Sequence, residues 1–277
     1  MTDRGRDQAS SDYVLGHSQR ELERLQGQAS LFADLTQDIL VRAGLAKGMR
    51  VLDLGCGAGD VSIIAADLVG PEGTVLGIDP APEALSIARA RLDALGKTWV
   101  KFELGSLESI SNGAEFDAVI GRFILIHLSS PADALRRLMQ HCRTGTTIVF
   151  AEFDLSTAAV QPPLLLLQQC IGWIGEVYRR TGRQPDMGAA LYDVYRAAGA
   201  MPQMIGLTRI TSGSDEAGYD FLVESVRSLM PAMDKLGIAT DKDVEIETLR
   251  ERLLAEAASG DHCIFYPRLV GAWAKVP

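Results

Sequence analysis

A ten-residue stretch, VLDLGCGAGD at residues 51–60, constrains the fold of this chain more than any other feature. Its first four residues read as a buried strand, three glycines follow at alternate positions, and an apolar segment begins at Val61. A strand, a glycine turn and a helix start in this order bring backbone N–H groups close to a ligand. The stretch therefore predicts a ligand-binding turn at the carboxyl end of a buried strand.

Strand-like and helix-like segments alternate from residue 30 to about residue 200. This alternation predicts an α/β fold in which helices cover both faces of a parallel sheet. Two later segments are expected to close the sheet, and the last of them contains Pro267, which belongs at a sheet edge or a bulge. The strands are expected at residues 50–54, 74–78, 99–104, 117–121, 146–152, 203–210 and about 262–274.

Three segments do not belong to this alternation. They are residues 13–30, which open with a capping box at Ser18 and Glu21, and the apolar-rich segments 162–180 and 215–237. Each segment by itself reads as an extra helix that fills a gap in the core. Together they favour a cap over a pocket, because α/β folds place ligands at the carboxyl ends of parallel strands.

A division of the chain into a core and its coverings follows from these segments. The expected units are an N-terminal arm and lid helix (1–30), the core (31–156), a helical cap insertion (157–186), a continuation of the core (187–213), a second cap insertion (214–260) and a C-terminal strand of the core sheet (261–277).

Charge and cysteine content exclude several classes of protein. A net charge of −9 and a pI near 5.0 argue against a nucleic-acid or anionic-membrane binder, which needs a cationic face. The N-terminus has no apolar signal segment, and no later stretch is long enough to span a bilayer. Four scattered cysteines without C-x-x-C spacing indicate a reduced compartment, the cytoplasm, and no zinc site.

The glycine turn departs from a dinucleotide-binding fingerprint. That fingerprint needs G-x-G-x-x-G, and here Asp60 replaces its third glycine. Asp53, inside the strand, would repel a pyrophosphate but attract the ammonium of an amino acid, and it could also accept hydrogen bonds from loop N–H groups. Asp79 ends the second strand, where a carboxylate binds both hydroxyls of a ribose. A ribose joined to an amino acid without phosphate is S-adenosylmethionine, which we expect as the cofactor.

At these residues the chain resembles the class I S-adenosylmethionine-dependent methyltransferases. VLDLGCGAG is similar to their glycine motif and GIDPAPEAL to the acidic motif that follows it. DAVIGRFILIHLSSPADALRRL is similar to their fourth-strand motif, especially in the small-molecule branch of ubiquinone and menaquinone biosynthesis and natural-product tailoring. The resemblance covers residues 32–155 well and 187–277 more loosely. It implies a Rossmann-like, doubly wound, seven-stranded sheet, mostly parallel with the last strand antiparallel, and a helical cap.

The resemblance also implies a set of cofactor contacts. Asp79 would bind the ribose and Pro80 would pack beside the adenine. Ser106 and Leu107 lie in LGSL, where many members carry an acid for the adenine amino group, so this contact would be weaker or made by backbone. The expected cofactor-binding residues are Asp53, Gly55, Gly57, Asp79, Pro80, Ser106, Leu107, Gly121 and Arg122.

Candidates for catalysis are few. His127 reads either as a base or as a residue that positions its loop. His17 and Tyr13 precede the capping box, and they either close over the cofactor or form a helix N-terminal staple. Glu152 and Asp154, at the end of the fifth strand, are either bases or a solvated strand end. No metal is expected.

The acceptor is expected to be a small, partly apolar organic molecule, such as a phenol, quinone, indole or isoprenoid-like compound. The apolar residues of 162–180 and 215–237 suit such a pocket, although they also suit a homodimer face. Methyl transfer to carbon, oxygen or nitrogen stays open. Two alternatives are an S-adenosylmethionine-binding protein that does not methylate its substrate and a nicotinamide-dependent Rossmann oxidoreductase.

Overall fold

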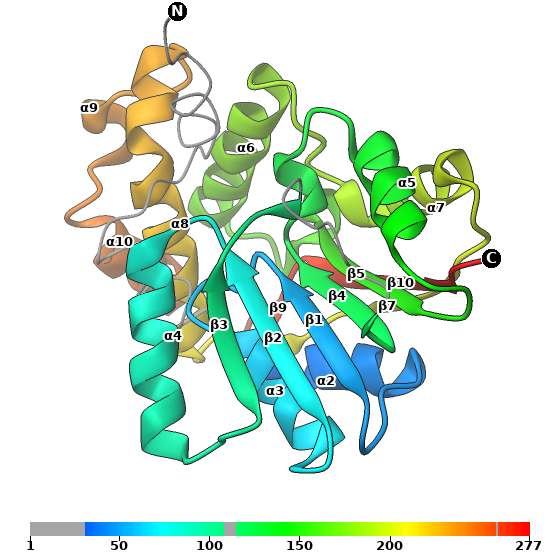
Figure 1. Ribbon diagram of the computed structural model, residues 1–277. Helices are drawn as coiled ribbons and strands as arrows, with labels where there is room; N and C mark the ends of the chain where they lie inside the picture. Colours follow the sequence, from blue (N-terminus) through cyan, green and yellow to red (C-terminus); the bar gives the residue numbers. More distant parts are fainter. Residues whose placement is uncertain (1–30, 108–114, 259) are drawn as a thin grey trace, which may run out of the picture.

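A large twisted sheet with helices on both faces forms the body of the molecule (Figure 1). The computed structural model describes residues 31–107, 115–258 and 260–277. Its seven strands lie in the order β3-β2-β1-β4-β5-β10-β7. They are β1 (Arg50–Leu54), β2 (Thr74–Asp79), β3 (Val100–Leu104), β4 (Ala118–Arg122), β5 (Thr147–Asp154), β7 (Gln203–Leu207) and β10 (Arg268–Lys275).

Parallel pairing joins the first five of these strands, whereas β10 pairs antiparallel with both β5 and β7. This topology confirms the prediction of a doubly wound sheet that is mostly parallel with the last strand antiparallel. The sheet order reverses at β1, whose neighbours are β2 and β4. A ligand site is expected outside the carboxyl end of such a strand.

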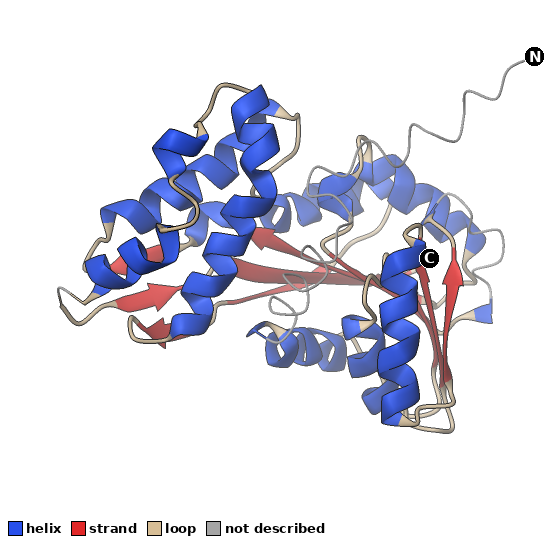
Figure 2. Cartoon of the chain, turned by 90° about the vertical axis from the view of Figure 1, so that its left-hand side faces the viewer, coloured by secondary structure: helices blue, strands red, loops and turns tan. Residues whose placement is uncertain are grey.

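Helices cover both faces of this sheet, and the central strand β1 is therefore buried on both sides. Val51 belongs to the apolar cluster under α2 (Ala33–Arg42), α3 (Asp60–Val69) and α4 (Pro82–Leu95). Leu52 and Leu54 belong to the opposite cluster, under α5 (Pro131–His141) and α7 (Met187–Ala198). Figure 2 shows the helices on either side of the sheet.

The two last predicted strands are wrong in extent. Segment 203–210 ends as a core strand at Leu207 and is followed by a separate strand, β8 (Ile210–Ser212). Segment 262–274 divides at Pro267, which lies between β9 (Cys263–Phe265) and β10. Proline has no N–H to donate to a ladder, so the strand breaks there and the chain changes sheets. The strands β6 (Ala159–Gln161), β9 and β8 form a three-stranded antiparallel sheet that the sequence did not predict.

The apolar segments outside the alternation form a cap with a core of its own. Helices α6 (Leu165–Arg180), α8 (Glu216–Lys235) and α10 (Leu249–Ala257) pack together with the small sheet around one apolar cluster, which includes Trp173, Val226 and Leu253. They gather beyond one end of the large sheet in Figure 1, with the short helix α9 (Asp241–Val244) at the outer edge. The third such segment, residues 13–30, lies outside the described residues.

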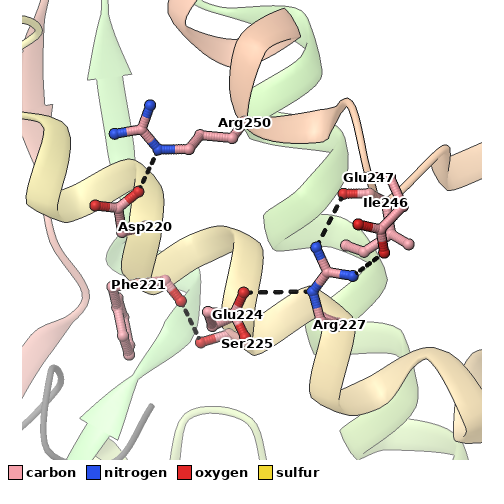
Figure 3. Close-up of polar contacts among 8 residues, drawn as sticks. All are labelled: Asp220, Phe221, Glu224, Ser225, Arg227, Ile246, Glu247 and Arg250. Atoms are coloured by element: carbon pink, nitrogen blue, oxygen red, sulfur yellow. Dashed lines mark hydrogen bonds and ion pairs between the residues drawn. The ribbon is translucent and has the colours of Figure 1, made fainter. Parts of the chain in front are cut away.

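Polar contacts fasten α8 to the chain that follows it (Figure 3). The guanidinium of Arg227 pairs with Glu224 and Glu247 and donates to the carbonyl of Ile246. Arg250 of α10 pairs with Asp220 and with Glu216 at the start of α8. The opposite face of α8 is therefore free to line a cavity.

Within the part of the chain that the structure describes, no helix combines the length and the apolar composition that a bilayer crossing needs.

Candidate active site

The glycine turn lies at the carboxyl end of β1 and leads into α3. Gly55 and Gly57 have positive φ angles of 60° and 53°, a conformation that glycine adopts without strain. A Cβ on Gly55 would lie 2.1 Å from Cδ1 of Ile124, so this position also needs a close approach. A Cβ on Gly57 would meet no atom within 4 Å, and Gly57 lines a cavity. The turn therefore leaves space beside its backbone, as a ligand-binding turn must.

Asp79 holds the turn in place from the end of β2. Its Oδ2 accepts a hydrogen bond from the N–H of Gly57 at 2.9 Å, and its Oδ1 accepts one from the N–H of Ala81 at 2.8 Å. The side chain also lines the cavity. The carboxylate is thus fixed by the backbone at the wall of the cavity.

Asp53 lies behind the turn, with only 1% of its surface exposed. Its Oδ2 accepts a hydrogen bond from Oγ of Ser62, in α3, at 2.6 Å. Burial raises the pKa of Asp53 to about 7, although the Ser62 hydrogen bond and the charge of Arg122 lower it. The carboxylate that accepts a hydrogen bond from a loop N–H is that of Asp79, not that of Asp53. Asp53 is not among the residues that line the cavity, and its direct contact with a ligand stays a prediction.

Arg122 leaves β4 beside the turn and lines the cavity. Its Nη1 donates to Oγ1 of Thr36 at 2.8 Å, and its guanidinium lies 5.3 Å from the ring centroid of Phe123. Burial lowers the pKa of Arg122, whereas the charges of Asp60 and Asp53 raise it. Gly121, directly before it, is not among the residues that line the cavity, and a Cβ there would lie 2.7 Å from the ring of Phe150. Its contact with a cofactor stays a prediction.

One cavity of about 1090 Å³ joins the turn to the cap. This exceeds the roughly 300–1,000 Å³ of ordinary ligand pockets, so it has room for a cofactor and a second small molecule. Its first end is lined by the turn and by Asp79, Pro80, Ala81, Ser106 and Leu107, and its second end by Leu155, Leu167, Ile171, Ile174, Tyr178, Arg183, Tyr219, Phe221, Leu222, Ser225, Leu229, Ile264 and Tyr266.

The two acids at the end of β5 have different surroundings, and neither is solvated. Asp154 is 1% exposed; its carboxylate pairs with Arg268 at 2.7 Å and accepts from the N–H of Ala189 at the start of α7. Glu152 is fully buried and lines the cavity. The solvated-strand-end interpretation is therefore wrong for both residues. Only Glu152 stands next to space that a ligand can fill.

His127 also lines the cavity, in the 3-10 helix Leu125–His127 that follows β4. His17 and Tyr13 lie outside the described residues. No group of three or more His, Cys, Asp or Glu side chains suited to a metal ion occurs among the described residues. Of the predicted contacts, the structure thus brings Gly55, Gly57, Asp79, Pro80, Ser106, Leu107, Arg122 and His127 around one cavity.

Sequence reasoning missed several cavity residues. Asp60 lines the cavity at the start of α3 while it pairs with Arg91 at 2.8 Å. Phe123 has a positive φ of 59°, which is uncommon for a bulky residue. A strained residue directly after a strand often marks a functional loop, but no pattern in the sequence signals it.

Comparisons with known proteins agree with this geometry. Residues 45–174 match the model of a family described as a methyltransferase domain. A ubiquinone biosynthesis O-methyltransferase of Thiobacillus denitrificans is 38% identical over 115 residues, which are 41% of this chain and 47% of that protein. A trans-aconitate 2-methyltransferase of Methylobacterium nodulans is 29% identical over 255 residues, which are 84% of this chain and 89% of that protein.

The fold is shared with solved structures at low identity. The structure of the YcgJ protein of Bacillus subtilis superimposes with a TM-score of 0.56 at 15% sequence identity. The match covers 87% of this chain and 98% of the YcgJ chain. The chain spans about half the length of most of the curated relatives that it matches.

Proposed function

We propose that this chain, whose residues 45–174 form a class I S-adenosylmethionine-dependent methyltransferase domain, transfers the methyl group to a small, partly apolar organic acceptor. The observation that carries the proposal is one continuous cavity, which runs from the glycine turn to the apolar walls of α6 and α8. A donor at the turn and an acceptor under the cap would share one space, as an in-line transfer requires.

The residues at the turn fit such a cofactor. The open space at Gly57 allows a ligand to approach the backbone, and the Asp79 carboxylate, fixed by two N–H groups, suits a ribose diol. Pro80 and Leu107 offer apolar contact for an adenine, with Ser106 beside them. Arg122 adds a cation where the carboxylate of an amino acid would be favoured.

When bound, S-adenosylmethionine supplies a methyl carbon on a positively charged sulfur, which is already an activated donor. The work left to the protein is to orient the acceptor and to exclude water from the reacting atoms. The apolar side chains of Ile171 and Ile174 in α6, and of Phe221 and Leu222 in α8, would do both at the cap end of the cavity.

The acceptor class is inferred from the charge of the cavity walls. The described cap-end lining residues are mostly aliphatic or aromatic, with Arg183 as their one cation. Such walls favour an aromatic, quinone-like, indole or isoprenoid-like metabolite over a polyanion. The quinone acceptor class is consistent with the similarity to a ubiquinone biosynthesis O-methyltransferase.

Further proposals concern the setting of the protein. A net charge of −9 disfavours nucleic acid as a partner. Four cysteines without a disulfide are consistent with a cytoplasmic protein. A role in secondary metabolism is a further proposal. A homodimer is also proposed from the sequence, although most of the apolar cap residues that suggested it are buried in the core of the cap or packed against it.

Calorimetry tests the proposal directly. S-adenosylhomocysteine should bind, and NADH should not. Incubation with S-adenosylmethionine and a panel of apolar phenols, quinols and indoles should then give products heavier by one CH2 unit. Binding of NADH in place of S-adenosylhomocysteine would favour an oxidoreductase, and a converted acceptor without added mass would favour a cofactor that is not consumed.

A further inference from the structure

Glu152 is a carboxyl group in the cavity wall whose hydrogen bonding is incomplete. Its Oε1 accepts from the N–H of Ile124 at 2.9 Å and from the N–H of Leu125 at 2.7 Å. Its Oε2 is buried and has no hydrogen-bond partner. A buried acceptor without a partner costs stability, so a native structure that retains one needs an explanation.

The position of Glu152 lies where the two ends of the cavity meet. Glu152 lies two residues before the end of β5. Its neighbour Ala151 pairs with Arg122, the last residue of β4, so Glu152 lies next to the loop that follows β4. The same loop contains Ile124, whose side chain approaches Gly55 of the glycine turn. On the other side, Phe153 and Leu155 continue the cavity wall toward the cap. Glu152 therefore lies in the cavity wall between the two ends, with its side chain fully buried in the structure.

We propose that Glu152 is the general base of the methyl transfer and that the acceptor is an apolar aromatic compound methylated on a hydroxyl oxygen. This inference rests on the proposed function. In the transfer, a lone pair of the acceptor oxygen forms the new bond to the methyl carbon. The carbon–sulfur bond breaks with its electron pair kept by sulfur, and the hydroxyl proton passes to Oε2 of Glu152. The proton then leaves to solvent when the products are released.

The two oxygens of Glu152 divide this work. Oε1 is held by backbone N–H groups, so the carboxyl group cannot rotate away from the cavity wall. Oε2 has the free lone pairs that a proton acceptor needs. Burial raises the pKa of Glu152 to about 8, although the N–H groups of the loop lower it. A base whose pKa lies near the working pH is well matched to a hydroxyl proton.

Charged groups on the elements around the end of β5 have mostly found other partners. Asp154 and Arg268 pair with each other, and Asp186 accepts from the N–H of Ser156. Arg122 is bonded to Thr36. His127 and Arg183 also line the cavity.

Among oxygen and sulfur acceptors, a hydroxyl is the group that needs a base. A thiol ionises readily and a carboxylic acid is ionised at neutral pH, so neither needs a base in the site. A phenol is neutral at that pH and gains nucleophilicity only as its proton leaves. The aromatic and aliphatic wall formed by Leu155, Ile171, Phe221 and Leu222 suits the ring that bears this hydroxyl.

The decisive variant is Glu152→Gln, because the amide oxygen still accepts from Ile124 and Leu125 while proton acceptance is lost. The probes are phenol, 1-naphthol and 5-hydroxyindole, each with the thiol and the carboxylic acid of the same ring. We expect methylation of hydroxyl probes only, with kcat/KM rising with pH until about pH 8. Glu152→Gln should lower that rate about 100-fold or more and remove the rise with pH, with S-adenosylhomocysteine affinity unchanged.

Asp154→Asn is the matched control, since it removes the charge of a buried acid on the same strand that does not line the cavity. It should lower the melting temperature and leave the pH profile as in the parent. Carbon-13 NMR of labelled glutamate gives a readout without turnover, because the signal lost in Glu152→Gln should titrate near pH 8 in the parent.

The inference is overturned if S-adenosylhomocysteine binds but no hydroxyl probe is methylated, if thiols or acids are preferred, or if Glu152→Gln keeps the parent rate and pH profile. A failure of S-adenosylhomocysteine to bind would instead reject the proposed function itself.

Discussion

Replacement of Asp79 by asparagine tests the junction between the glycine turn and the second strand. The carboxylate accepts from Gly57 at 2.9 Å and from Ala81 at 2.8 Å, one bond on each oxygen. Asparagine has one oxygen, so one of these N–H groups would face an amide NH2 and lose its acceptor. A buried donor without a partner costs about 1–3 kcal/mol. We expect the free energy of unfolding of Asp79→Asn, without ligand, to fall by about this amount.

Cofactor affinity should fall as well, through a separate cause. Asp79 is 9% exposed and lines the cavity, so a ribose hydroxyl that donates to it would be shielded from water. Loss of one anionic oxygen should weaken S-adenosylhomocysteine binding by about 1–3 kcal/mol, or about 5- to 150-fold in Kd. Urea unfolding measures the first effect, and calorimetry at 25 °C measures the second. Asp93→Asn, an exposed acid of α4, is the control and should change neither.

A folded Asp79→Asn protein that binds S-adenosylhomocysteine within about two-fold of the parent would refute this reasoning. Asp79 would then hold the turn without touching the ligand, and the acidic motif would be structural.

Three further predictions follow from named contacts. Gly57→Val should abolish S-adenosylhomocysteine binding by calorimetry and leave a folded protein by circular dichroism, because its side chain would fill open cavity space at a φ of 53°; normal affinity would contradict this. Asp53 has its pKa raised to about 7, so the folded state holds a proton that the unfolded state has lost, and stability should fall as pH rises from about 4 to 7. Asp53→Asn should flatten that fall in urea unfolding at pH 5 and pH 7, and an unchanged slope would reject the pKa argument. Arg227→Met should lower the free energy of unfolding by only about 1 kcal/mol, since its partner Glu247 is largely exposed. The same change should weaken acceptor binding more than cofactor binding, because α8 lines only the cap end of the cavity. An equal loss of both affinities would count against the division of the cavity into two ends.

Local spacing in the sequence was enough to predict the centre of the fold. The strand, the glycine turn and the helix start of residues 51–60 are neighbours in the chain, and the rules for buried strands and turns act over a few residues. Asp79 was predicted at the end of the second strand as a ribose ligand, whereas its hydrogen bond with the N–H of Gly57 was not predicted. The alternation of strands and helices predicted a parallel sheet covered on both faces, and the resemblance to class I methyltransferases implied its doubly wound arrangement.

Only the tertiary structure decided which acids are buried and which of them faces the cavity. Glu152 and Asp154 stand two residues apart on one strand, yet Asp154 is neutralised by Arg268, more than a hundred residues later, and Glu152 is held by the loop after β4. The break at Pro267 sends β9 into a second sheet with β6 and β8, strands far from it in sequence. A sequence pattern reports the preferences of neighbouring residues, whereas burial and pairing depend on contacts between distant segments, which exist only once the chain has folded.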